Sequence, residues 1–172
     1  SGLYYLLKCI NKPGAEVILP SDTCVVVAHS IVLAGYKPVF LDNAINSRQP
    51  SCDQYLAAIN ENTVMVIPTH LYGIPQETKE LFFQIKSLRP DIFVLQDCAH
   101  SFFCKDFNGV PVTQYGDGAL FGMNISKLVN SVKGGILTLN DKQTALKVRE
   151  LIKNGKINSS IRSRLYVAAA AI

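Results

Sequence analysis

The chain is organised around residues 117–141, which read DGALFGMNISKLVNSVKGGILTLND. This pattern predicts a short apolar strand at 118–121, a turn that carries Lys127, and, after Gly134, a second strand at 135–139. A lysine between two buried strands is unusual, because burial of a cation is costly unless it is paired or neutralised. One use of a lysine so placed is to form a Schiff base with an aldehyde. Taken alone, Lys127 is more simply interpreted as a solvated loop residue, so the rest of the chain must decide.

Short apolar segments alternate with helical segments upstream of this stretch. Strands are predicted at 16–20, 37–42, 64–68 and 92–95, and helices at 3–10, 21–34, 53–59 and 76–88. Ser21-Asp22 is the expected N-cap of the second helix, which Gly35 ends, although the β-branched run at 25–27 disfavours a helix there. This alternation predicts βαβ units and a parallel sheet covered on both faces.

After His100 the pattern changes. Asn108-Gly109 indicates a hairpin turn, and the strands at 118–121 and 135–139 have no long helix between them. A helix is predicted at 141–154, capped by Asp141. We therefore expect an α/β fold, a three-layer sandwich with a mostly parallel mixed sheet.

Composition places the chain among ordinary globular proteins. It has 172 residues, 48% hydrophobic and 17% charged, which is enough for one domain with a sizeable core. The net charge is +4, and many of the basic residues are spread over a predicted helix and the tail that follows it. This distribution is typical of a solvated helix face and favours it over nucleic-acid binding. Five cysteines without a Cys-x-x-Cys motif indicate reduced thiols in a cytoplasmic protein without a metal site. No apolar run reaches membrane-spanning length, and no signal peptide is evident.

Polar residues cluster where the predicted strands end. Asp97 and His100 follow one strand, His70 follows another, and Lys127 follows a third. Ligands of open α/β sheets bind at such carboxyl ends. An acid, a lysine and a helix N-terminus at Ser1-Gly2 for a phosphate together suit pyridoxal 5'-phosphate (PLP). Each has a simpler explanation alone: a turn cap for Asp97 and ordinary hydrogen-bonded histidines for His70 and His100. The combination favours the cofactor.

Eight segments in order resemble the DegT-type sugar aminotransferases, which are fold-type-I PLP enzymes with an aspartate aminotransferase-like large domain. They are Glu-Val-Ile-Leu-Pro-Ser (16–21), Ala-Gly-Tyr-Lys-Pro-Val-Phe-Leu-Asp (34–42), Pro-Thr-His-Leu-Tyr-Gly (68–73), Gln-Asp-Cys-Ala-His (96–100), Gly-Asp (116–117), Ser-Lys (126–127), Gly-Gly (134–135) and Asn-Asp (140–141). The similarity extends from residue 1 to about residue 155.

The resemblance implies roles for individual residues. Lys127 would carry PLP and move the proton, and Asp97 would pair with the pyridine nitrogen. His100 would lie beside the cofactor ring. The other implied cofactor-binding residues are Ser1 and Gly2 at the phosphate, Ser126 before the lysine, and Cys24 at a position where the family has a stacking aromatic residue.

The chain also departs from the family pattern. Leu3 replaces a threonine at the phosphate site, and Gly122 replaces a serine that contacts the phosphate. Cys24 removes a stacking surface, His29 stands in place of an asparagine, and Val132-Lys133 replaces a Gly-Glu pair. These changes bear on PLP affinity more than on the chemistry of Lys127.

The resemblance implies a dimeric enzyme that moves an amino group from an amino acid, such as glutamate, to a nucleotide-linked keto-sugar. Because family members are much longer, residues 1–172 are expected to be the PLP-binding large domain, without an N-terminal arm and a C-terminal small domain. Two alternatives stay open. One is a PLP-dependent sugar dehydratase, which Lys127 disfavours because those relatives usually have histidine there. The other is a degenerate, non-catalytic homologue or fragment with a structural or assembly role.

Overall fold

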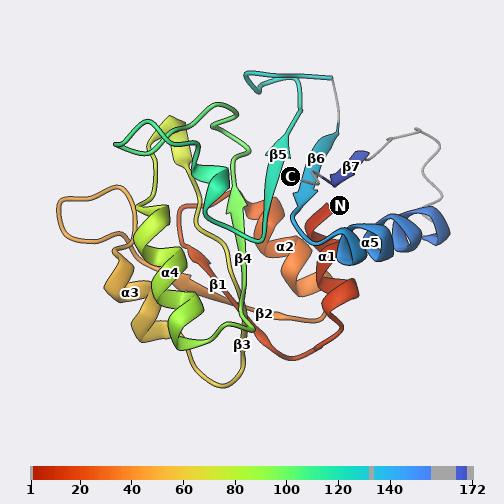
Figure 1. The fold of residues 1–172 in the computed structure, drawn as a ribbon, viewed down its shortest axis with the longest axis horizontal. Coiled ribbons are helices and arrows are strands. Elements are labelled where there is room, and N and C mark those ends of the chain that lie inside the picture. Colours follow the sequence, from red (N-terminus) through yellow and green to blue (C-terminus); the bar gives the residue numbers. More distant parts are fainter. Residues whose placement is uncertain (1, 132–133, 156–165, 170–172) are drawn as a thin grey trace.

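The computed structural model describes residues 2–131, 134–155 and 166–169. In this part of the chain, seven strands form one sheet in the order β2-β1-β3-β4-β5-β6-β7 (Figure 1). Their bounds are Glu16–Pro20 (β1), Lys37–Leu41 (β2), Thr63–Val66 (β3), Phe93–Asp97 (β4), Gly118–Gly122 (β5), Gly135–Leu139 (β6) and Tyr166–Ala169 (β7). Strands β1 to β5 are mutually parallel, β6 is antiparallel to β5, and β7 is parallel to β6. The predicted mixed, mostly parallel sheet is confirmed.

Helices cover both faces of the sheet. Their bounds are Gly2–Ile10 (α1), Val25–Leu33 (α2), Cys52–Ala58 (α3), Thr78–Leu88 (α4) and Lys142–Asn154 (α5). Alternate residues of a strand point to opposite faces. In β1, Val17 and Leu19 join the core under α1, α2 and α5, whereas Ile18 joins the core under α3 and α4. Figure 1 shows these two helix groups on opposite sides of the sheet, which is the predicted three-layer sandwich.

One local prediction was wrong, and one strand was not predicted. Helix α2 does not begin after Ser21-Asp22. Its N-cap is Cys24, and the three valines at 25–27 are helical. The cost of β-branched residues in a helix is a few tenths of a kcal/mol each, and burial of Val27 and Ile31 in the core outweighs it. Strand β7 was not expected either, and its pairing with β6 is a long-range contact that a local pattern does not reveal.

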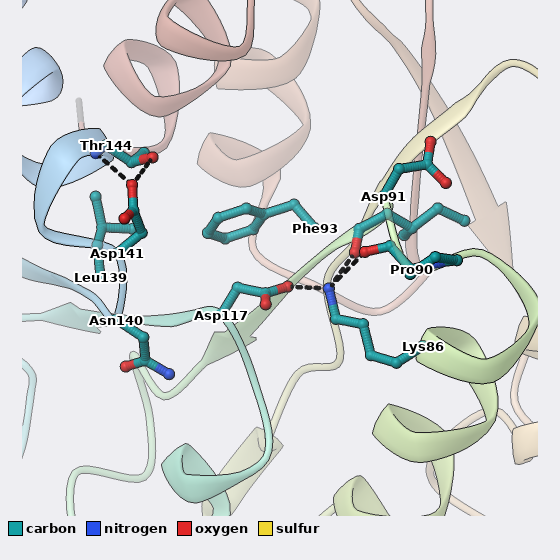
Figure 2. A pocket seen from close by; sticks show the side chains of 10 residues that line it. Lys86, Pro90, Asp91, Phe93, Asp117, Leu139, Asn140, Asp141 and Thr144 are labelled. Atoms are coloured by element: carbon teal, nitrogen blue, oxygen red, sulfur yellow. Dashed lines mark hydrogen bonds and ion pairs between the residues drawn. The ribbon is translucent and has the colours of Figure 1, made fainter. Parts of the chain in front are cut away.

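An ion pair lies at the amino-terminal ends of β4 and β5 (Figure 2). Lys86 of α4 places Nζ 2.7 Å from Asp117 Oδ2 and donates to the carbonyl of Ile92 at 2.7 Å. Asp117 Oδ2 also accepts the backbone N–H of Val94 at 2.7 Å. These bonds join α4 to the start of β4 and to the residue before β5. They fix the end of the sheet opposite to its carboxyl edge.

The topology gathers distant segments at that carboxyl edge. The turn after β1, the loops after β3 and β4, and residues 123–131 after β5 all lie there, and Figure 1 shows the segment after β5 projecting beyond the sheet. The N-terminus of α1 lies at the same edge, because Gly2 and Lys127 line one cavity. The fold therefore brings segments spread over more than a hundred residues into one site.

Candidate active site

A cavity of about 300 Å³ opens at the carboxyl edge of the sheet. The residues that carry chemistry there are Asp97 at the end of β4, Lys127 in the β5–β6 connection and Cys24 before α2. Backbone from the N-terminus of α1 and three glycines complete its wall, and the glycines are Gly122, Gly134 and Gly135. The structure thus brings together four of the seven residues predicted to form the site: Gly2, Cys24, Asp97 and Lys127.

Asp97 is a buried carboxyl held by its own backbone. Its N–H donates to the carbonyl of Pro68 at 2.9 Å, its carbonyl accepts from His70 N–H at 3.0 Å, and Oδ1 accepts from Ala99 N–H at 3.0 Å. Only 2% of the residue is exposed. Burial raises the pKa of Asp97 to about 6, against the opposing effects of the Ala99 hydrogen bond and the charge of Lys127. A carboxyl so disfavoured as an isolated anion is suited to pair with a cation that enters the cavity.

Lys127 is half-buried in a backbone turn. Its N–H donates to the carbonyl of Asn124 at 2.9 Å, and Met123 N–H donates to the carbonyl of Gly134 at 3.0 Å, which closes the loop at its base. The charge of Lys127 lowers the pKa of both Asp97 and His100. Lys127 and Asp97 also line the same cavity, so both can contact one ligand, and the catalytic role of Lys127 stays a prediction.

The cavity wall at the N-terminus of α1 is built partly from glycines, which have no side chain. Gly2 begins α1, whose free N–H groups and helix dipole favour an anion. A Cβ on Gly2 would lie 3.3 Å from Leu137 Cβ, so glycine lets α1 pack tightly on β6. A Cβ on Gly135 would lie 2.6 Å from the carbonyl oxygen of Phe121. These close approaches explain glycine at both positions.

Gly122 is a departure from the family pattern that the structure clarifies. A Cβ there would lie 3.2 Å from Ala99 Cβ and 3.4 Å from Lys127 Cε. The first distance is tighter than ordinary van der Waals contact, so a serine would require Ala99 to shift. Ala99 and Lys127 therefore pack closely against β5 at the position where the family has a serine.

His100 lies beside the first cavity. It is largely exposed and lines a second cavity of about 250 Å³, which shares Cys24, Asp97 and Ala99 with the first. Burial and the charge of Lys127 lower the pKa of His100. Its ring packs edge-to-face on Tyr72 at 5.8 Å between centroids. The predicted place beside the cofactor ring stays a prediction.

Two other residues, Ser126 and Ser1, were also predicted to bind the cofactor. Ser126 is exposed in the loop and is not among the residues that line either cavity. Ser1 lies outside the described residues. The departure at Val132-Lys133 is also outside them, because the description resumes at Gly134.

His70 is an internal structural residue. Its Nδ1 accepts the N–H of Gln76 at 3.1 Å, and its Nε2 lies 3.0 Å from Gln96 Oε1. Burial lowers its pKa to about 4, so the ring is neutral at physiological pH. The structure supports the interpretation of His70 as an ordinary hydrogen-bonded histidine.

Residues that the sequence did not single out also line the site. Ala99 and Asn124 line the first cavity, and Thr69 lines the second. Ala99 and Thr69 fall within the motifs Gln-Asp-Cys-Ala-His and Pro-Thr-His-Leu-Tyr-Gly, so position in a motif was the available signal. Asn124 had none beyond lying three residues before Lys127.

The residues present fit PLP. A buried carboxyl at Asp97 matches the pyridine nitrogen, an amine at Lys127 matches the aldehyde, and a glycine-lined helix N-terminus matches the phosphate. Within the described residues, no group of three or more His, Cys, Asp or Glu side chains is placed to hold a metal ion. No described helix is both long and apolar enough to cross a membrane.

A further cavity of about 510 Å³ lies at the opposite edge of the sheet (Figure 2). The charged groups there serve the fold. Lys86 pairs with Asp117, and Asp141 caps α5 by accepting from the N–H and hydroxyl of Thr144 at 2.6 Å each. Figure 2 shows these two bonded groups on separate sides of the cavity. The candidate active site is therefore the cavity at the carboxyl edge.

Curated proteins similar to this chain include nucleotide-sugar aminotransferases. The UDP-4-amino-4-deoxy-L-arabinose–oxoglutarate aminotransferase of Shewanella sediminis is 33% identical over 156 residues, which cover 90% of this chain and 39% of that protein. The dTDP-4-amino-4,6-dideoxy-D-glucose transaminase of Shigella dysenteriae is 30% identical over 162 residues, 93% of this chain and 43% of that protein. The chain therefore spans about two-fifths of the length of these relatives.

Solved structures have the same fold. The crystal structure of DesI in the presence of its TDP-sugar product matches with a TM-score of 0.79 and 28% identity, over 91% of this chain and 39% of DesI. NtdA from Bacillus subtilis, with bound cofactor PMP, matches with a TM-score of 0.77 and 21% identity, over 96% of this chain and 37% of NtdA. The predicted fold class is confirmed.

A family model covers almost the whole chain. Residues 2–168 match the model of the DegT/DnrJ/EryC1/StrS aminotransferase family. This match includes every described residue of the cavity that Lys127 and Asp97 line. The chain belongs to the DegT/DnrJ/EryC1/StrS aminotransferase family.

Proposed function

We propose that this chain is the PLP-binding large domain of an aminotransferase that moves an amino group from an amino acid to a nucleotide-linked keto-sugar. The observation that carries the proposal is that Lys127 and Asp97 line one cavity with the N-terminus of α1. The names of the relatives support the substrate class, and one of them pairs a UDP-sugar with oxoglutarate, the keto acid of glutamate. Glutamate is therefore the proposed donor.

The roles of the residues follow from their positions. PLP, when bound, supplies an electron sink at the carbon that loses its proton. Asp97 would hold a proton at the pyridine nitrogen, because a buried carboxylate gains most from a cationic partner. The Nζ of Lys127 would bond the aldehyde until the donor's amine displaces it. The freed amine would then move a proton from the donor's α-carbon to the cofactor carbon that carried the aldehyde. Backbone N–H groups at Gly2 would bind the phosphate.

A direct test is to add PLP to the purified protein, reduce with borohydride and map the labelled peptide. We expect a visible absorption band and reduced label on Lys127. Lys127→Ala should abolish both, whereas Lys105→Ala, at an exposed lysine outside the cavity, should leave them unchanged. Label spread over surface lysines, or absent from folded wild-type protein, would contradict the proposal.

A second candidate is a non-catalytic member of the family with a role in assembly. Cys24 and Gly122 favour it, because the first offers no stacking ring and the second offers no phosphate hydroxyl. It predicts folded protein without PLP label on Lys127. The same experiment therefore separates the two candidates. A sugar dehydratase is disfavoured by Lys127, since relatives with that activity usually have histidine there.

We also infer that the protein forms a homodimer. Helix α2 is mostly apolar, and its residues Val25, Val26, Val32 and Leu33 are 57–73% exposed. A helix of this kind is normally buried, and Val26 also lines the active-site cavity. In sedimentation experiments Leu33→Asp should shift the protein toward monomer, whereas Ile45→Asp, at an exposed loop residue, should not.

The free thiols of all five cysteines are consistent with a cytoplasmic location.

A further inference from the structure

Thr69 lines the second cavity, and no part of the preceding mechanism uses this residue. Thr69 follows β3, pairs with Asp97 through an isolated parallel bridge and is 5% exposed. Its Oγ1 is fully buried and has no hydrogen-bond partner among the described residues. An unpaired buried hydroxyl costs stability, so a position that retains one is a candidate for binding a ligand.

The surroundings of Thr69 define which kind of ligand would satisfy it. The second cavity is also lined by Thr23, Tyr72 and His100, and it opens to the first cavity at Cys24, Asp97 and Ala99. Thr23 Oγ1 also lacks a partner within the described residues. Leu71 and Ala99 supply apolar wall, and Asp22 adds a second carboxyl to the lining. Hydroxyl donors on an otherwise partly apolar wall suit an oxygen atom carried on a flat ring.

The two cavities divide the surroundings of Asp97 into two sides. Gly2, Gly122 and Lys127 line only the first cavity, and Thr69 and His100 line only the second. The substituents of the pyridoxal ring also lie on two sides. Its phosphate arm extends from one side of the axis through the ring nitrogen, and its phenolic oxygen extends from the other. A ring that has its nitrogen at Asp97 and its phosphate at α1 presents the phenolic oxygen to the second cavity.

We propose that Thr69 is a cofactor-positioning residue that donates its hydroxyl hydrogen to the phenolic oxygen of the pyridoxal ring. This inference rests on the proposed function, because it requires PLP in the first cavity. It gives the buried hydroxyl the partner that it lacks. It also gives the ring a lateral contact, which matters in a chain where Cys24 offers no stacking surface.

The test compares two ligands on three proteins. Thr69→Val keeps the shape and removes the donor, and Thr69→Ser keeps the donor. Dissociation constants are measured by absorbance for PLP and for 3-deoxypyridoxal phosphate, which lacks the phenolic oxygen. We expect Thr69→Val to weaken PLP binding about fivefold, the effect of one ordinary hydrogen bond, and to leave binding of the deoxy analogue unchanged. Thr69→Ser should bind both as the wild type does.

The outcomes separate the inference from the proposed function. If the wild type binds PLP at Lys127 and Thr69→Val binds it equally well, the inference is overturned and the proposed function stands. An equal loss for PLP and the deoxy analogue would also overturn it, because that pattern indicates a general packing defect. A change confined to the KM for a nucleotide sugar would assign Thr69 to the substrate instead. If the wild type binds neither ligand, the proposed function fails as well. Thermal unfolding without cofactor checks that each variant is folded.

Discussion

His70 and Gln96 lie 26 residues apart in the sequence and hydrogen-bond in the interior, with Nε2 of the imidazole 3.0 Å from Oε1 of the amide. Nδ1 accepts the N–H of Gln76, so Nε2 carries the hydrogen and donates it to Gln96. Gln96 in turn donates through Nε2 to the carbonyl of Tyr115 at 2.5 Å. Because Gln96 immediately precedes Asp97, this chain of bonds holds the strand end that presents the Asp97 carboxyl to the cavity.

The first prediction concerns His70. His70→Leu leaves two buried groups, Gln76 N–H and Gln96 Oε1, without partners, and each such group costs about 1–3 kcal/mol. We therefore expect a loss of about 2–4 kcal/mol in the free energy of unfolding, measured in urea. His29→Leu, at an exposed histidine of α2, is the control and should change stability little. Equal effects of the two substitutions would show that the His70 network contributes no stability.

The same histidine predicts a dependence on pH. Burial lowers the pKa of His70 from 6.5 to about 4, so the unfolded chain binds a proton at higher pH than the folded protein does. Its contribution to stability is complete above pH 6.5 and declines as the pH falls to about 4. His70→Gln should remove this decline, which urea titrations of both proteins at pH 7.5, 5.5 and 4.5 will measure.

The raised pKa of Asp97 predicts that the stability of the cofactor-free protein depends on pH with the opposite sign to the effect of His70. Burial raises its folded pKa from 3.8 to about 6, so stability is highest below pH 3.8 and falls as the pH rises to about 6. Asp97→Asn removes this penalty and keeps an acceptor for the N–H of Ala99. Without cofactor, we expect the variant to be about 3 kcal/mol more stable than the wild type at pH 7.5, and equal to it near pH 4. A difference that is independent of pH would contradict this account. Addition of PLP should stabilise the wild type more than the variant.

The position of Cys24 predicts that an aromatic substitution there will tighten PLP binding. The residue is exposed and lines both cavities, where an aromatic ring would offer a stacking face to the cofactor. Aromatic pairs contribute about 0.5–1.5 kcal/mol beyond the area they bury. Cys24→Phe should therefore tighten PLP binding by about two- to tenfold, measured by fluorescence quenching, and Cys24→Ser should not. Weaker binding by the phenylalanine variant would show that the cofactor uses the space beside Cys24.

The ion pair in Figure 2 predicts a loss of stability without a loss of cofactor binding. Lys86→Met keeps the aliphatic length but removes the donor to Asp117 Oδ2 and to the Ile92 carbonyl. Hydrogen bonds to charged groups contribute about 1.5–3 kcal/mol, and we expect a loss in that range by chemical denaturation. The dissociation constant for PLP should be unchanged, because Lys86 lies at the opposite edge of the sheet from Lys127. Lys79→Met, on the same helix, is the matched control.

Much of the architecture could be predicted because it depends on local, periodic patterns. The apolar runs at β1, β3 and β4 and the amphipathic helices α4 and α5 carry their own signals, and the mixed sheet followed from the short connection around Lys127. Helix α2 was misplaced at its start because the valines at 25–27 prefer strands locally, and only the core beneath Val27 and Ile31 reverses that preference.

The sequence by itself determined which groups are available for chemistry: a lysine in a turn between two strands, a carboxyl at a strand end and a glycine at the start of a helix. The tertiary structure alone decided how they act. It placed Gly2, Asp97 and Lys127 around one cavity, buried the Asp97 carboxyl enough to raise its pKa, and turned His70 inward as a structural residue. It also left the Thr69 hydroxyl buried without a partner beside them. These properties depend on burial and on contacts between residues far apart in the chain, and neither is present in a local pattern.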